Sequence, residues 1–171
     1  HTTDRHFSTE NKGIDGFTIE KLLHNIDDWI TTYDPDIVTV LIGINDIGIM
    51  INTRRTPQQQ QILMKEFSER YEILACKLSA IQRTVPSTST RKLFFLEPFI
   101  FPWPQCYASW IPLLSQMSCE IRTISQKYGA VFVPLQDDLM QEASRVGINN
   151  ITTDGIHLTP LGHQFLAKKI Y

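Results

Sequence analysis

The chain has 171 residues, 42% of them hydrophobic and 20% charged, and a formal net charge of −2. This length predicts one domain that buries roughly two-thirds of its unfolded surface, and the composition excludes a disordered chain. The 16 basic and 18 acidic residues form no basic stripe, which argues against nucleic acid or an anionic membrane as the main partner.

The first predicted elements are a short strand, a turn and a helix. Phe7 to Glu10 favour a strand that runs into a turn at Gly13 and Gly16, and Gly13 is expected to need a positive φ angle. From Thr18 the apolar residues recur at helical spacing, which predicts a helix with one buried face. That face consists of Ile19, Leu22, Leu23, Ile26, Trp29 and Ile30.

A strand and a long helix follow. Asp34-Pro35 ends the first helix, and the β-branched run 37–42 predicts a strand covered on both faces in a parallel sheet. Thr56-Pro57-Gln58-Gln59 has the pattern of a capping box with proline at the first helical position, which predicts a helix from there to about Arg83. The buried side of this helix is expected to hold Ile62, Phe67, Tyr71, Leu74, Leu78 and Ile81.

The second half of the chain continues the alternation. A polar loop is predicted at 86–90, followed by a buried strand at 93–96 and a proline-rich segment at 97–104 that leaves the sheet. A helix over 110–128 is expected to end at Gly129. After it the sequence predicts a strand at 130–135, a helix at 136–145 and a last helix that begins at Thr159-Pro160. Alternating strands and helices of this kind predict a three-layer α/β/α architecture with a parallel sheet. Because the sequence contains no repeat or linker, residues 1–171 are expected to form a single domain.

Three short motifs lie where predicted strands end or helices begin. Asp154-Gly155-Ile156-His157 places a carboxylate three residues before a histidine, within reach of the ring Nδ1–H, where it would fix the tautomer of a general base. The other two motifs are Asn11 to Gly16 and Gly43 to Asp46. Because functional residues gather at the carboxyl edge of a parallel sheet, we expect all three to meet there.

In their order and spacing, these motifs resemble the SGNH (GDSL-type) hydrolases over nearly the whole chain. Asn11 to Gly16 matches the second block of that family, Asn-x-Gly-x-x-Gly, and Gly43 to Asp46 matches the third, Gly-x-Asn-Asp. Asp154 to His157 matches the fifth block, Asp-x-x-His. Within the family, the chain looks most like the branch that contains bacterial carbohydrate acetylesterases. Three segments carry this likeness: Asn-Lys-Gly-Ile, Ile-Gly-Ile-Asn-Asp and the Glu-Pro-Phe that follows a buried strand. The resemblance implies a flavodoxin-like parallel sheet.

The resemblance also implies roles for four residues. The backbone N–H of Gly16 and the side-chain NH₂ of Asn45 would hold the oxyanion, and the loss of one such donor typically costs about 10²–10³ in turnover. His157 would be the general base and then the acid, oriented by Asp154. The implied activity is hydrolysis of a small-molecule or carbohydrate ester without a cofactor or metal. The acyl group would be short, and the branch resemblance suggests acetyl.

The nucleophile of the family is missing from this sequence. It lies in the first block, Gly-Asp-Ser, and the chain has no Gly-Asp dipeptide. Ser8 is the only serine before Asn11, but it sits within the predicted first strand and is not expected to serve. In the family the strand that carries the serine lies inside the sheet, between the second and third strands. We therefore expect domain 1–171 to be N-terminally incomplete, with that strand and its serine supplied from outside these residues.

Other interpretations of the same residues remain open. Gly43 to Asp46 fits an ordinary turn with Asx hydrogen bonds. Asp154 and His157 fit an ion pair beside a helix or two metal ligands, although the other histidines show no matching ligand pattern. Glu97 fits either a pocket wall or a helix cap. Four aromatic residues fit a wall for a sugar or acyl group, but core packing is the safer interpretation for Phe99, Phe101, Trp103 and Trp110.

The alternative function from a different class is a catalytically inactive SGNH-like domain that binds a glycan or a protein. A membrane-spanning segment is not indicated, since the longest apolar run covers only residues 40–44. The three cysteines lack zinc-ligand spacing and indicate no disulfide framework; they favour a reducing, cytoplasmic compartment (Cys76, Cys106 and Cys119).

Overall fold

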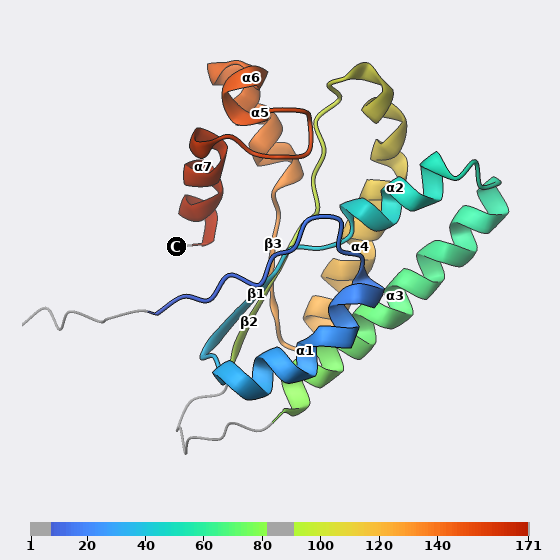
Figure 1. Ribbon diagram of the computed structural model, residues 1–171. Coiled ribbons are helices and arrows are strands. Elements are labelled where there is room, and N and C mark those ends of the chain that lie inside the picture. Colours follow the sequence, from blue (N-terminus) through green and yellow to red (C-terminus); the bar gives the residue numbers. More distant parts are fainter. Residues whose placement is uncertain (1–7, 82–90, 171) are drawn as a thin grey trace, which may run out of the picture.

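The protein has a parallel sheet at its centre, as the sequence predicts. The computed structural model describes residues 8–81 and 91–170. Three parallel strands lie in the order β1 (Ile37–Val40), β2 (Lys92–Leu96) and β3 (Val131–Val133). Val38 pairs with Leu93, and Phe95 pairs with Phe132 (Figure 1). The predicted α/β class with a parallel sheet is therefore confirmed.

Helices connect the strands and also follow the last strand. They are α1 (Ile19–Tyr33), α2 (Ile44–Asn52), α3 (Pro57–Ala80), the 3-10 helix η1 (Gln105–Trp110), α4 (Ile111–Lys127), α5 (Gln136–Val146), α6 (Ile148–Ile151) and α7 (Pro160–Ile170). The capping box of α3 forms as predicted, because the Gln59 N–H donates to Thr56 Oγ1 and the Thr56 N–H donates to Gln59 Oε1. The sequence does not predict α2 and α6.

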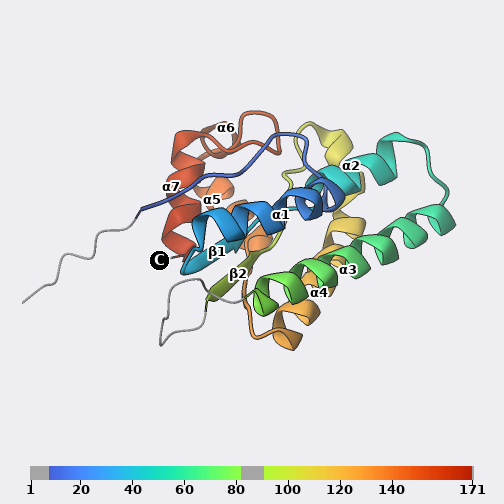
Figure 2. The same cartoon turned by 60° about the horizontal axis from the view of Figure 1, so that its bottom comes forward.

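Side chains of the central strand alternate between two separate hydrophobic cores. Leu93 and Phe95 of β2 join the core built with α1, α2, α3 and α4, whereas Phe94 and Leu96 join the core built with α5, α6 and α7. Figures 1 and 2 show the two groups of helices on opposite sides of the sheet. The layers are thus helix, sheet and helix around β2 and β3.

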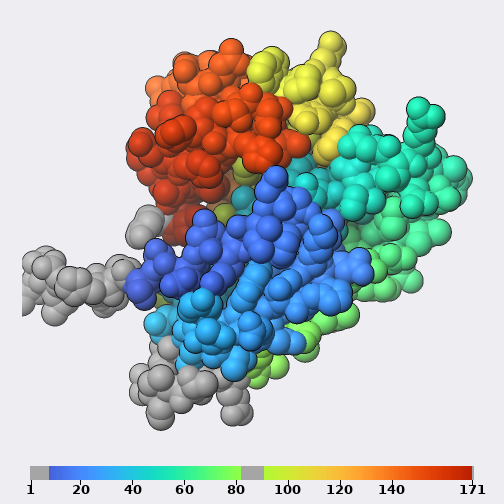
Figure 3. All heavy atoms as spheres, in the orientation of Figure 1, coloured from blue at the N-terminus to red at the C-terminus, as the bar shows by residue number. Residues whose placement is uncertain are grey.

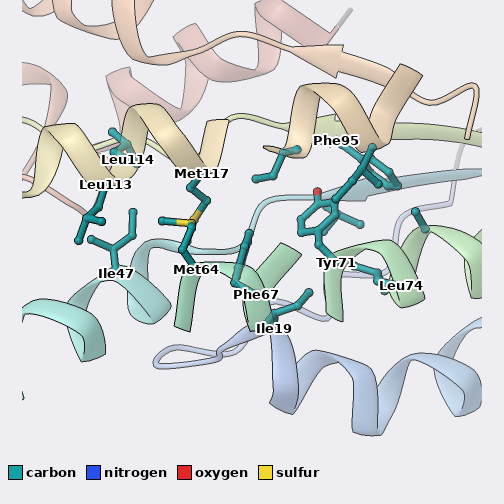
Figure 4. Close-up of a cluster of buried hydrophobic side chains, with 14 of the residues drawn as sticks. Ile19, Ile47, Met64, Phe67, Tyr71, Leu74, Phe95, Leu113, Leu114 and Met117 are labelled. Atoms are coloured by element: carbon teal, nitrogen blue, oxygen red, sulfur yellow. The ribbon is translucent and has the colours of Figure 1, made fainter. Parts of the chain in front are cut away.

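The larger core lies under α3. Phe67, Tyr71 and Leu74 of this helix are buried, and Tyr71 meets Phe95 of β2 edge to face with ring centroids 5.3 Å apart. Met117 of α4 packs beside them (Figure 4). This core fixes the positions of α1 and α2, whose buried side chains belong to the same cluster.

The strand β1 is covered on one face only, which corrects the prediction of a strand buried on both. Val38 and Val40 face the larger core, but Ile37 is 47% exposed and the following Leu41 is 41% exposed. In the part of the chain that the structure describes, β1 is an edge strand whose only ladder partner is β2. The helices of the smaller core reach β2 and β3 but not β1.

Two predictions for the N-terminal segment are wrong. Residues 8–10 form no strand, and Phe7 lies outside the described residues. No backbone hydrogen bond joins residues 8–18 to β1 in the described part of the chain, so this segment has no ladder to enter. Gly13 does not adopt a positive φ angle, whereas Gly16 does, at +71°.

Smaller corrections concern the long helices. Ile62 of α3 is 59% exposed rather than buried, because it lies on the solvent side of the helix. The helix ends at Ala80, and the expected extension to Arg83 and the polar loop at 86–90 reach outside the described residues. The helix expected over 110–128 is observed as α4, preceded by the unpredicted η1, and Gly129 lies just beyond its end at φ +66°.

Candidate functional site

The predicted acid–base pair forms a direct hydrogen bond. Nδ1 of His157 lies 2.7 Å from Oδ2 of Asp154, and Oδ1 of Asp154 accepts the backbone N–H groups of Ile156 and His157 at 2.9 and 2.8 Å. The carboxylate is thus held by three contacts within its own loop. This arrangement leaves Nε2 of His157 directed away from Asp154, as a general base requires.

Gly155 allows this loop to pack against the segment that follows β2. Its φ angle is +94°, and a Cβ added there would lie 2.0 Å from the carbonyl oxygen of Trp103. The Gly155 carbonyl accepts the N–H of Phe101 at 2.9 Å, and its own N–H donates to Thr152 Oγ1. No other residue type fits without moving the loop, so Gly155 fixes the position of the acid–base pair.

Charge and hydrogen bonds shift the pKa values of the pair in opposite directions. Burial alone would raise the pKa of Asp154, but hydrogen bonds from the backbone and ring of His157 and from Ile156 outweigh it and lower that pKa. The hydrogen bond to Asp154 raises the pKa of His157 above its ordinary value. The imidazolium form of His157 is thereby stabilised, which suits a group that takes up a proton during a reaction.

A second carboxylate, which the sequence motifs do not predict, lies at the other ring nitrogen. Oδ1 of Asp15 lies 3.6 Å from Nε2 of His157, and the Asp15 side chain is 91% exposed. In the space-filling view the N-terminal segment lies against the C-terminal part of the chain (Figure 3). Asp15 directly precedes Gly16, so its place in the second motif was the only signal in the sequence.

The third motif forms the start of α2. Gly43 has a φ angle of +125°, and a Cβ there would lie 2.5 Å from Met117 Sδ, so only glycine fits. Two residues later, Nδ2 of Asn45 donates to the carbonyl of Phe17 at 3.0 Å, which ties α2 to the Gly16 turn. An amide has two N–H groups, so Asn45 keeps a second donor. The ordinary Asx turn considered for this motif is not what the side chains form, because they bond to the α1 segment.

Asp46 also joins α2 to α1. Its carboxylate accepts the backbone N–H of Ile19, at 3.2 and 3.3 Å, at the start of α1. Burial raises the pKa of Asp46 to about 7, against the opposing effect of the hydrogen bond from Ile19. The carboxylate therefore links the two segments that carry Gly16 and Asn45.

A groove of about 770 Å³ opens beside these two residues. We call it the α1–α2 groove. Gly16, Asn45 and Ile156 line its end nearest the acid–base pair. The rest of its lining is formed by Thr18, Glu20, Lys21, His24, Ile44, Gly48, Ile49, Asn52, Thr53, Tyr107 and Trp110. The three motifs, far apart in sequence, thus meet around one concave surface.

Glu97 and most of the aromatic candidates contribute to the packing of the fold. Glu97 accepts the N–H groups of Leu135 and Gln136 at 2.7 and 2.9 Å, so it caps α5, and it also accepts the hydroxyl of Ser118. Three of the four aromatic candidates are core residues, namely Phe99, Phe101 and Trp110, while Trp103 is 41% exposed. Trp110 still reaches the α1–α2 groove with part of its ring.

Neither a serine nor a metal-binding group adjoins His157 in the described residues. Ser8 lies exposed outside any strand, and within residues 8–81 and 91–170 no serine hydroxyl bonds to His157. Over the same residues, no group of three or more His, Cys, Asp or Glu side chains is placed to hold a metal ion. The helices of the described chain include none that is long and apolar enough to cross a membrane.

The sequence of the chain matches a known protein family. Residues 2–165 match the sequence model of the GDSL-like lipase/acylhydrolase family. Among curated protein sequences, none matches the chain significantly.

Several solved structures share the fold. A protein designated a GDSL-like lipase, from Parabacteroides merdae, superposes with a TM-score of 0.74 at 20% identity, over 93% of this chain and 69% of that one. Axe2, an acetylxylan esterase from Geobacillus stearothermophilus, gives 0.73 at 19% identity, over 94% and 68%. LAE5, an alpha/beta hydrolase from the metagenome of Lake Arreo in Spain, gives 0.71 at 18% identity, over 91% and 66%. The chain thus spans about two thirds of the length of these proteins.

Axe2 has also been solved as catalytic mutants in which a serine, an aspartate or a histidine is replaced by alanine. In that enzyme the aspartate and the histidine are three positions apart in sequence.

Proposed function

Because the chain belongs to the GDSL-like lipase/acylhydrolase family and is thus a carboxylic ester hydrolase, we propose that it works as a serine esterase with His157 as the general base. The observation that carries this proposal is the 2.7 Å hydrogen bond between Asp154 and Nδ1 of His157, which leaves Nε2 unbonded to Asp154 in a loop whose Ile156 lines the α1–α2 groove. The three-residue spacing of the pair equals that of the aspartate and histidine replaced in the catalytic mutants of Axe2. An inactive binding domain is not favoured.

The reaction proceeds in two halves. A serine hydroxyl attacks the ester carbonyl carbon while Nε2 of His157 takes its proton, and the tetrahedral oxyanion accepts hydrogen bonds from the Gly16 N–H and the second N–H of Asn45. The intermediate collapses as His157 returns the proton to the leaving alcohol. Water then attacks the acyl-serine by the same route and restores the enzyme. Asp154 holds the ring and stabilises the imidazolium in both halves.

The serine reaches the site on a strand that pairs with β1 and lies outside residues 1–171. Support comes from the free edge of β1 among the described residues. The unpaired backbone groups of such an edge are satisfied when a further strand is added, and the exposed Ile37 and Leu41 show that one face of β1 also lacks cover in the described chain. Domain 1–171 is on this account the larger part of a hydrolase domain.

The substrate is an ester with a short acyl group, such as acetyl on a carbohydrate. The fold shared with Axe2, an acetylxylan esterase, supports this choice. So does the α1–α2 groove, which offers polar side chains beside the oxyanion donors.

Hydrolysis of p-nitrophenyl acetate by the full-length protein tests the proposed base. His157→Ala should lower kcat/KM by about 10⁴–10⁶, the loss found when the histidine of a serine hydrolase triad is removed. His163→Ala, an exposed histidine of α7, is the matched control and should keep full turnover. Equal turnover of the two variants would refute the assignment of His157.

A further inference from the structure

The α1–α2 groove has a shape and lining that the reaction itself does not use. We propose that it binds the carbohydrate part of the substrate over more than one sugar ring, so that the ester carbonyl is held at Gly16 and Asn45. This inference rests on the proposed esterase function, because it assigns the groove to the alcohol side of the same ester.

The length of the groove exceeds what a short acyl group fills. Its α2 wall is a continuous stripe from Asn45 to Thr53. Eight residues at 1.5 Å each give about 12 Å along the helix. An acetyl group would occupy only the end beside Asn45, and the remainder suits a chain of sugar rings.

The polarity of the groove favours hydroxyl groups over an alkyl chain. In the described part of the chain, the Glu20 carboxylate and the Asn52 amide form no hydrogen bond, and both line the groove. His24 uses only Nδ1, which lies 2.8 Å from the Glu20 carbonyl, so Nε2 remains available. An alkyl chain would cover these polar groups without bonding them, which opposes the gain from burying its CH₂ groups, whereas sugar hydroxyl groups would bond to them.

Aromatic side chains of η1 form one wall of the groove. The rings of Tyr107 and Trp110 meet edge to face with centroids 4.9 Å apart, and Tyr107 is only half-buried. Gly48 opposes them in the middle of α2, where a Cβ would lie 3.2 Å from Trp110 Cη2. Glycine inside a helix is unfavourable compared with alanine, so its presence here is explained by the close approach of the indole. The apolar faces of sugar rings pack on aromatic walls of this kind, while their hydroxyl groups bond to the polar rim.

Binding of xylotriose, which carries no ester, tests this assignment apart from hydrolysis. Titration of the full-length protein, followed by tryptophan fluorescence, should show saturable binding. Asn52→Ala on α2 and His24→Ala on α1 should each weaken it about tenfold, which corresponds to the loss of one hydrogen bond. Gln126→Ala removes an exposed amide on α4 outside the groove and should bind as the wild type does. No saturable binding, or equal affinity in all four proteins, would overturn the proposal.

Kinetics separate this proposal from the proposed function. The ratio of kcat/KM for acetylated xylotriose to that for p-nitrophenyl acetate should fall about tenfold in Asn52→Ala and His24→Ala, with the loss in the xylotriose value. If the wild type binds xylotriose but hydrolyses neither ester, the esterase function fails and the groove assignment stands. A wild-type preference for p-nitrophenyl octanoate over the acetate, without xylotriose binding, would assign the groove to acyl chains and refute it.

Discussion

Asp154 contacts His157 through both its ring and its backbone, so the carboxylate sets the orientation and the charge of the imidazole together. The bond raises the pKa of His157, and a base works only in its neutral form. Turnover should therefore fall as the pH drops through this raised pKa. The acidic limb of kcat/KM is expected above the ordinary histidine value of about 6.5.

Asp154→Asn should change both the height and the position of the pH profile. In the full-length protein, turnover of p-nitrophenyl acetate should drop by about 10⁴. The acidic limb of the residual activity should move to lower pH, because Asp154 makes the largest contribution to the raised pKa of His157, while the smaller one from Asp15 remains. The pH dependence of kcat/KM measures both effects. An acidic limb that stays in place would show that Asp154 does not set the pKa of the base.

Gly155 is the residue whose replacement should move the pair without altering either member. In Gly155→Ala the new Cβ cannot remain 2.0 Å from the Trp103 carbonyl oxygen, so the loop must shift. A displacement of about 1 Å at a catalytic group can cost about 10² in turnover. We expect a loss of that size in kcat, with the cooperative thermal transition retained.

Gly129→Ala is the matched control for Gly155→Ala. Gly129 also has a positive φ angle, but no atom lies within 4 Å of an added Cβ. In both variants the left-handed backbone at alanine lowers the free energy of unfolding by about 1–2 kcal/mol. Only Gly155→Ala also disturbs the acid–base loop. Comparable kcat values in the two variants would contradict a positioning role for Gly155.

The sequence predicted candidate residues for the site but not all of their neighbours. Asp154, His157, Gly16 and Asn45 could be named because each belongs to a short motif. The contact of Asp15 with His157 depends on how the N-terminal segment lies against the C-terminal part, which no local pattern encodes. The role of Glu97 as a cap of α5 likewise depends on the packing of two distant segments.

At the scale of elements, α1 and α2 are joined by polar contacts that also position Gly16 and Asn45, the proposed oxyanion donors. Asn45 bonds to the Phe17 carbonyl and Asp46 to the Ile19 N–H. The charged form of the Asp46 carboxylate destabilises the folded protein, because burial raises its pKa to about 7 from an ordinary value of 3.8. The folded protein therefore binds more protons than the unfolded chain between these pH values.

Asp46→Asn should flatten the pH dependence of stability in that range. A raised carboxyl pKa stabilises the fold at low pH, and this contribution is lost as the pH rises towards 7. Asparagine keeps an oxygen that can accept the Ile19 N–H but does not ionise. Compared with the wild type, the variant should gain Tm progressively between about pH 4 and pH 7, the interval between the two pKa values, as scanning calorimetry can measure. A constant difference in Tm across that range would contradict the assigned titration.

Elements with a local signal were predicted and the others were not. The α3 start carries its own capping box, and Asp34-Pro35 marks the end of α1. The helix α2 has four isoleucines and a central glycine in nine residues, a composition that does not favour a helix. Its helical state follows from packing on α3 and η1 rather than from propensity.

At the scale of the whole molecule, the sheet is covered unequally. Both faces of β2 are buried, but β1 has one exposed face and a free edge in the described chain. The sequence could not predict this, since a run of β-branched residues looks the same in a central strand and in an edge strand. A strand added at β1 would complete the sheet and bring a side chain to the edge where Gly16, Asn45 and His157 meet.

Covalent labelling of the full-length protein with a fluorophosphonate tests whether a serine outside residues 1–171 is activated by His157. The reagent reacts with a serine only when a base activates it, so labelling reports the nucleophile and its partner together. Mass spectrometry should find one phosphonylated serine per molecule, outside residues 1–171, and His157→Ala should abolish the label while His163→Ala keeps it. Absence of the label from the wild type, or a label on a serine within residues 1–171, would contradict the account.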